Sequence, residues 1–158
     1  MTRQSGEMRL LTDLLTESFH ARAWHGTNLR GSIRGLSVQE VVRRPGPGRH
    51  NVWEIVVHCA YWKYIVRRRI MGGKKGSFYI KGSNWFSVGK SEREWHRDVA
   101  TLQTCHQRLM EAVRSMRPDD LYRTPQGSKV SNAAILRGIA SHDLYHAGQI
   151  QLIKRLIR

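Results

Sequence analysis

Apolar side chains recur along most of this chain at intervals of three and four residues, which is the spacing of one face of an α-helix. Such stripes predict four long helices, over about residues 8–22 and 51–71, from residue 91 to Pro118, and from residue 131 nearly to the C-terminus. No segment shows the sustained alternation of a β-strand, and only a short extended piece is expected, at residues 78–80. Amphipathic helices bury their apolar faces against one another, so the predicted fold class is all-α, a four-helix bundle.

Local signals mark where the predicted helices begin and where the chain turns. Asn51 and Ser91 each stand three residues before a glutamate, the capping-box pattern that satisfies the first amides of a helix. Ser131 is the expected cap of the last helix. The first helical stripe is interrupted at residues 24–27 and then resumes, so a bend or a second short helical piece is expected there. Residues 72–90 hold five glycines and form a long connection, which is expected to act as a lid or as part of a subunit contact.

The balance of charge is strongly basic. The chain has 27 Lys and Arg residues against 12 Asp and Glu residues, a formal net charge of +15. This charge favours nucleic acid, an anionic membrane surface or acidic small molecules as partners, although a solvated basic helix surface explains it as well. There is no apolar run of eighteen residues and no signal-peptide pattern. Cys59 and Cys105 both fall in predicted helices, which indicates reduced thiols in a cytoplasmic protein.

Three histidines lie on the predicted inward faces of two helices. His142 and His146 are four residues apart, so their imidazoles leave the same face of the last helix. That face continues the apolar stripe of Ile135, Ile139 and Ile153, while His58 falls on the inward stripe of the second helix. Three imidazoles plus water make an open, catalytic-type site for one divalent ion, best Zn²⁺ or Ni²⁺. The alternative is that they are buried histidines with hydrogen-bond partners.

Four further residues are candidates for the pocket around such a site, and a fifth, Asp143, stands next to a predicted ligand. His106 is also on an inward stripe, where a core histidine is the simpler interpretation, and His25 either lines the pocket or caps the break after the first helix. Glu54 could accept a hydrogen bond from a ligand, but its capping-box place already explains it. Gln149 continues the stripe of the histidine pair, and Asp143 is expected to form a surface or interhelical salt bridge.

Three segments resemble motifs of the DinB/YfiT-like superfamily of metal-dependent enzymes. In chain order they are residues 24–26 (WHG), 51–58 (NVWEIVVH) and 142–150 (HDLYHAGQI), which is the order expected for that family. The resemblance covers essentially the whole chain, residues 1–158, as a single domain. It implies an up-down-down-up four-helix bundle with a long crossover connection, often dimeric.

The resemblance also implies a site and a range of activities. It assigns the metal ligands to His58, His142 and His146. The sequence departs from the family pattern at Asn51, where Ser or Thr is common. The implied activity is that of a metal-dependent hydrolase, or of an S-transferase or isomerase that uses a low-molecular-weight thiol, acting on a small molecule. Two alternatives from other classes stay open: a basic nucleic-acid-binding helical module, and a homodimer whose metal only stabilises the fold.

Overall fold

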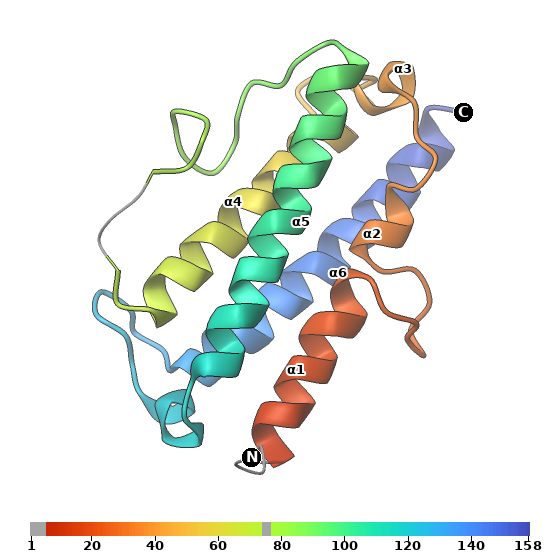
Figure 1. Cartoon of the computed structure of the whole chain (residues 1–158). Coiled ribbons are helices and arrows are strands. Elements are labelled where there is room, and N and C mark those ends of the chain that lie inside the picture. The colour runs from red at the N-terminus through yellow and green to blue at the C-terminus, as the bar shows by residue number, and fades with distance from the viewer. Residues whose placement is uncertain (1–5, 74–76) are drawn as a thin grey trace.

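Helices make up most of the computed structural model, which describes residues 6–73 and 77–158 and contains no strand within those ranges (Figure 1). The long helices are α1 (Gly6–Phe19), α4 (Val52–Ile70), α5 (Glu92–Ser115) and α6 (Asn132–Leu156). The short ones are α2 (Leu29–Ser32), α3 (Val38–Val41) and the 3-10 helix η1 (Pro118–Tyr122).

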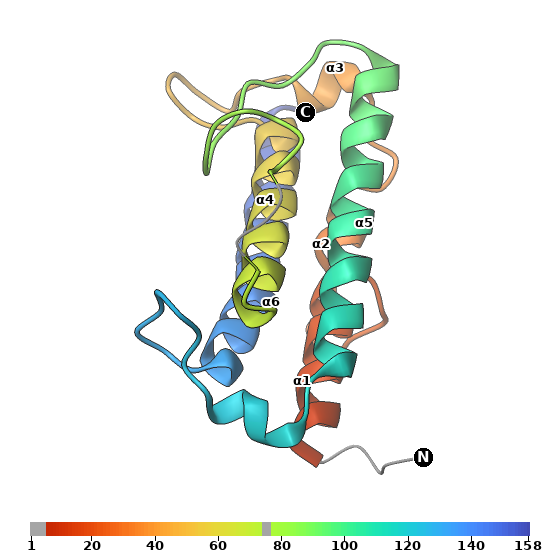
Figure 2. The same ribbon diagram turned by 60° about the vertical axis from the view of Figure 1, so that its left-hand side comes forward.

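The four long helices lie side by side. α1 and α6 run in one direction and α4 and α5 in the other (Figure 1). α4 packs against both α5 and α6, and α1 completes the arrangement by packing against α6 and α5 (Figure 2). Because α4 and α5 point the same way, the chain must return along the length of the molecule between them, which explains the long connection after α4.

The predicted helix starts are confirmed. The Asn51 and Ser91 side chains accept hydrogen bonds from the amides of Glu54 and Glu94, and both glutamates complete capping boxes. Ser131 accepts a hydrogen bond from the Ala134 amide at the start of α6. Each such cap stabilises its helix by about 1 kcal/mol relative to alanine.

Two local predictions are wrong. The first helix ends at Phe19 rather than near residue 22, because the amides of His20 and Ala21 both turn back to the Thr16 carbonyl. Residues 78–80 do not form an extended piece, because the chain bends there and the Phe78 ring packs on Tyr61 and Phe86. Residues 74–76 of the same predicted connection lie outside the described residues.

The predicted stripes account for most of the buried core. Ile139, Leu102 and Val113 are all buried where the sequence pattern places them. Leu156 is an exception, with 62% of its surface exposed, whereas the residue that follows it, Ile157, is buried. No helix among the described residues has the length and apolar character needed to cross a membrane.

Candidate metal centre

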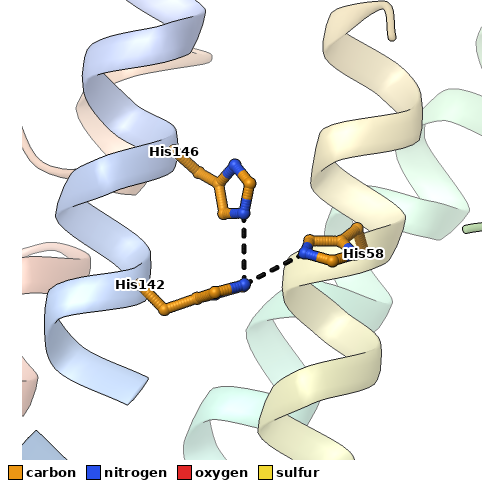
Figure 3. Close-up of side chains that lie close together, drawn as sticks. All are labelled: His58, His142 and His146. Atoms are coloured by element: carbon orange, nitrogen blue, oxygen red, sulfur yellow. Dashed lines mark hydrogen bonds between the residues drawn. The ribbon is translucent and has the colours of Figure 1, made fainter. Parts of the chain in front are cut away.

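The three predicted ligands come together between α4 and α6. His58 Nε2 lies 3.0 Å from His142 Nε2, and His146 Nε2 lies 3.1 Å from the same atom (Figure 3). His142 and His146 approach from successive turns of α6, and His58 faces them from α4 (Figure 3). The same ring nitrogen of each residue therefore points at one common region.

The outer nitrogens of two of these rings are held by oxygen atoms. His58 Nδ1 donates to the backbone carbonyl of Asn84 at 2.9 Å, and His146 Nδ1 donates to Gln149 Oε1 at 2.7 Å. Gln149 in turn donates through Nε2 to the Tyr145 hydroxyl at 3.1 Å, which leaves its Oε1 as the acceptor toward His146. A neutral imidazole that is protonated at Nδ1 carries a lone pair at Nε2, so His58 and His146 both aim lone pairs inward.

This donor set fits a divalent cation. Two inward lone pairs face His142 Nε2, and a single proton on that atom would pair with only one of them. Two imidazole nitrogens bound to one ion through bonds of about 2.0–2.1 Å lie about 2.9–3.4 Å apart, which includes both observed separations. The Nδ1 atom of His142 is buried and has no hydrogen-bond partner among the described residues.

Burial keeps the three imidazoles neutral. It lowers the pKa of His58, and it lowers the pKa of His142 to about 3 and that of His146 to about 4. The neighbouring histidines lower the pKa of His142 further, whereas the hydrogen bond to Gln149 partly opposes the shift of His146. Metal-binding histidines must be deprotonated, so these directions suit ligands.

The connection between α4 and α5 closes one side of the cluster. The Trp85 ring stacks on His58 with centroids 4.0 Å apart, and His50 stacks on the other face of Trp85 at 3.5 Å. Asn84, which adopts a left-handed backbone with φ of 63°, accepts a hydrogen bond from Trp62 Nε1 at 3.0 Å. The sequence pattern marks the long connection as functional but does not predict that Asn84 and Trp85 contact His58. The adjacent aromatic residues Trp85 and Phe86 are the feature of the connection that indicates a buried contact.

The remaining predicted pocket residues have different surroundings. Glu54 binds Arg44 and, at 2.9 Å, His50, so it supports the outer end of the Trp85 stack and does not contact the ligands. Burial alone would raise the pKa of Glu54, but hydrogen bonds from Arg44, His50 and the Asn51 amide hold it below its usual range. His25 is exposed in the segment that joins α1 to α2, outside the histidine cluster.

A buried ion pair lies directly beneath the cluster. Lys63 Nζ lies 2.5 Å from Asp143 Oδ2, and both side chains are completely buried. The predicted interhelical salt bridge of Asp143 is confirmed, but it lies in the core and not on the surface. Burial raises the pKa of Asp143 to about 6, against the opposing effect of Lys63. The Cys59 thiol is nearby, and burial raises its pKa well above its usual value, so it stays a thiol.

A cleft of about 780 Å³ has His146, one of the three clustered histidines, in its lining. One wall is the α3–α4 connection, including Arg49, and the other is the face of α6 that carries Tyr145 and Gln149. Ile55, Leu152 and Ile153 give the cleft an apolar surface. A small molecule with both polar and apolar parts matches this lining.

Comparisons with known proteins identify the family. Neither the curated proteins nor the solved structures that were searched gave a match. A family model, described as the DinB superfamily, matches residues 21–150, a range that includes all three clustered histidines. This match covers well over half of the chain, and an all-helical fold with a buried histidine cluster is consistent with it. The chain therefore belongs to the DinB superfamily.

Proposed function

We propose that this protein is a metalloenzyme in which His58, His142 and His146 hold one divalent ion, best Zn²⁺ or Ni²⁺. The observation that carries the proposal is the convergence of three Nε2 atoms, two of them fixed as lone-pair donors by Asn84 and Gln149. A structural zinc site is usually closed by four protein ligands, whereas three ligands leave a position for water or substrate.

A bound divalent ion would supply Lewis acidity, enough to lower the pKa of a coordinated water from 15.7 to about 7 or to hold a thiolate at neutral pH. The protein supplies orientation and shielding. Asn84 and Gln149 fix the two ring tautomers, and the stacked Trp85 keeps water from one side of His58. The open side is the cleft, where the Tyr145 hydroxyl and the Arg49 guanidinium are available to position a polar or anionic substrate group.

The reaction class that follows is hydrolysis of a small molecule, or transfer or isomerisation that uses a low-molecular-weight thiol as cosubstrate. Both need an open metal position and a neighbouring binding surface with apolar and polar parts. The cleft has a volume of about 780 Å³, in the usual range for small-molecule sites of about 300–1,000 Å³. The basic character of the chain would draw an anionic thiol or substrate toward it.

The proposal extends to the bundle topology, the cellular location and the partners of the protein. The directions of the long helices support an up-down-down-up four-helix bundle that forms one domain (Figure 1). The free cysteines Cys59 and Cys105 support a reducing, cytoplasmic location. A homodimer stays a prediction from the family resemblance, and nucleic-acid binding stays a prediction from net charge alone.

The first experiment is metal analysis and activity screening of protein purified without a histidine tag. We expect about one zinc or nickel per chain and metal-dependent turnover with a panel of esters, amides, and electrophiles supplied with thiols. Tyr145→Phe should change turnover without changing metal content, because the hydroxyl lines the cleft but is not a proposed ligand. Protein that takes up no metal after reloading with Zn²⁺ and with Ni²⁺ would contradict the proposal.

Removal of the metal separates a catalytic from a purely structural role. If the site is catalytic, chelation should abolish turnover while the helical circular dichroism is retained, because the described core is extensive without an ion. Unfolding on chelation would favour a structural metal instead.

A further inference from the structure

A second groove, of about the same volume as the first, lies away from the histidine cluster. It runs along one face of α5, between that helix and the segment formed by α1 and α2, and its volume is about 790 Å³. It shares no lining residue with the cluster or with the cleft beside His146. Its function therefore needs a separate explanation.

The walls of this α5 groove are basic. Its lining includes three arginines and three histidines, and no Asp or Glu is among the described residues that line it: Arg30, Arg34, Arg114, His20, His96 and His106. One of these groups, His96, pairs with a carboxylate outside the groove: its Nε2 lies 3.9 Å from Glu92 Oε2 on the exposed surface. The groove thus offers positive charge that acidic neighbours within its walls do not neutralise.

The floor of the groove is apolar and aromatic. Phe19, Ile33, Trp95 and Met110 are buried there. The His106 ring lies among them, stacked on Phe19 with centroids 3.8 Å apart and an interplanar angle of 15°. The Phe19 ring is covered by His106 and by the Lys63 ammonium, 4.8 Å from its centroid, so a ligand would meet the apolar floor beside the edge of the His106 ring.

His106 adds polar groups that point to a ligand. It is 4% exposed, and neither ring nitrogen has a hydrogen-bond partner among the described residues. Burial, reinforced by Lys63 and His20, lowers the pKa of His106 to about 2, so the ring is neutral at physiological pH. A neutral imidazole offers one donor and one acceptor, and leaving both unpaired in a core is unfavourable.

We propose that the α5 groove binds a small organic anion with an aromatic body. The aromatic body would lie against the apolar floor beside the edge of the His106 ring, and the anionic group would lie against Arg30 and Arg34. Arg30 Nη1 donates to Gln103 Oε1 at 2.5 Å across the groove, which places its guanidinium one helical turn of α5 from His106. Carboxylate, phosphate and sulfonate groups all match a guanidinium pair, so the shared chemistry is an aromatic anion.

The volume favours one small molecule. Sites for cofactor-sized ligands usually enclose about 300–1,000 Å³, and the groove falls in that range. Arg34 is exposed and stands one turn beyond Arg30, so it is free to meet a ligand without disturbing the core. This assignment does not depend on a metal at His58, His142 and His146.

The test uses a matched pair of fluorescent probes on the full-length protein. 1-Anilinonaphthalene-8-sulfonate is an aromatic anion, and N-phenyl-1-naphthylamine has the same body without the sulfonate. We expect the anion to bind at least about tenfold more tightly at low salt, because a charge-assisted hydrogen bond to a guanidinium has about that effect on affinity. Arg34→Gln should remove most of that advantage and leave the binding of the neutral probe unchanged.

Two controls keep the test specific to the groove. Arg93→Gln removes an exposed charge of α5 that lies outside the groove lining, and it should leave both affinities near those of the wild type. In ¹⁵N spectra of the histidine rings, the anionic probe should shift the signals of His106 and not those of His58. The His106 signals can be assigned with His106→Phe.

Three results would overturn the proposal. One is equal affinity for the charged and neutral probes, since the arginines would then play no part. Another is an Arg34→Gln variant that behaves like Arg93→Gln. The third is saturation by the anion with no change in the His106 ring signals, because the probe would then lie elsewhere.

Discussion

His106 and the histidines of the cluster occupy similar places in the sequence pattern but have opposite surroundings. Both lie on inward helix stripes, and burial lowers the pKa of each. In the cluster, Asn84 and Gln149 fix the outer nitrogens of His58 and His146, and the Nε2 atoms of both lie within 3.1 Å of His142 Nε2. The His106 ring instead stacks on Phe19, and neither of its nitrogens has a partner among the described residues.

The difference shows what makes a buried histidine a candidate ligand. Burial and a depressed pKa are shared, so neither identifies a metal site. The distinguishing features are a fixed tautomer and a lone pair aimed at other lone pairs. His106 lacks both features, which fits a core position at the floor of the α5 groove.

The largest expected effect is the loss of metal when one cluster histidine is removed. His142→Ala should lower the metal content from about one ion per chain to less than a tenth, because even changes around a ligand weaken metal binding about 10–100-fold. His106→Phe, the matched change outside the cluster, should keep the full content. The measurement is elemental analysis of both variants after dialysis. Equal metal content in the two variants would remove the distinction between the two kinds of histidine.

A second prediction concerns the ion pair that lies between these regions. Lys63 contacts Asp143 beneath the cluster, and its ammonium also lies 4.8 Å from the centroid of the Phe19 ring. Lys63→Met should lower the free energy of unfolding by about 3–5 kcal/mol, because it leaves a buried carboxylate without its partner. Urea denaturation of chelator-treated protein measures this change without a contribution from metal.

The double variant Lys63→Met/Asp143→Asn is the control for that prediction. It removes both charges, so it should recover most of the lost stability. If the single variant were as stable as the wild type, the buried pair would not be a structural feature of the core.

The third prediction tests how the cluster is supported. Gln149→Leu removes the acceptor of His146 Nδ1, and we expect the metal affinity to fall by about 10–100-fold while the ligands remain. Tyr145→Phe removes only the next hydrogen bond in the chain and should have a smaller effect. Competition with a chromophoric chelator gives both affinities. An unchanged affinity for Gln149→Leu would mean that the tautomer of His146 is set in another way.

The smallest expected effect is the acid sensitivity that comes from His106. Its pKa is about 2 in the folded protein and about 6.5 in an unfolded chain, so acidification protonates the unfolded state first and destabilises the fold. Between pH 7.5 and 5.5 this one group should lower the free energy of unfolding by about 1.4 kcal/mol. Lys63, His20 and Arg114 are the charged or titratable groups that act on it.

His106→Phe should therefore flatten the pH dependence of stability by that amount. Chelator-treated wild type and variant are compared by urea denaturation at the two pH values. His25→Phe changes an exposed histidine and should keep the wild-type slope. A variant at position 106 with the full acid sensitivity would show that this ring is not kept neutral by the fold.

The sequence was informative where local rules decide the structure. Capping boxes at Asn51 and Ser91 gave helix starts that the structure confirms, because a cap is satisfied within its own first turn. The spacing of His142 and His146 placed both rings on one face for the same local reason. His58 could be set on an inward stripe, and the structure brings it within 3.0 Å of His142 Nε2.

The parts that could not be predicted depend on contacts between distant segments. Asn84 and Trp85 reach His58 only because the α4–α5 connection folds back along α4, and no periodicity describes that path. His25 is exposed, since the chain after α1 turns without burying it. The buried ion pair of Lys63 could have been predicted from the sequence. Lys63 lies on the same inward stripe as Val56 and Cys59, and a lysine at such a position needs a buried acidic partner.

X-ray absorption spectroscopy of the metal-loaded protein tests the central claim most directly, because it counts the ligands of the ion. We expect three imidazoles at about 2.0–2.1 Å, with the remaining positions filled by oxygen from water. His142→Ala, reloaded with the same metal, should lose this signature. A spectrum with fewer imidazoles in the wild type, or with sulfur from Cys59, would contradict the proposed site.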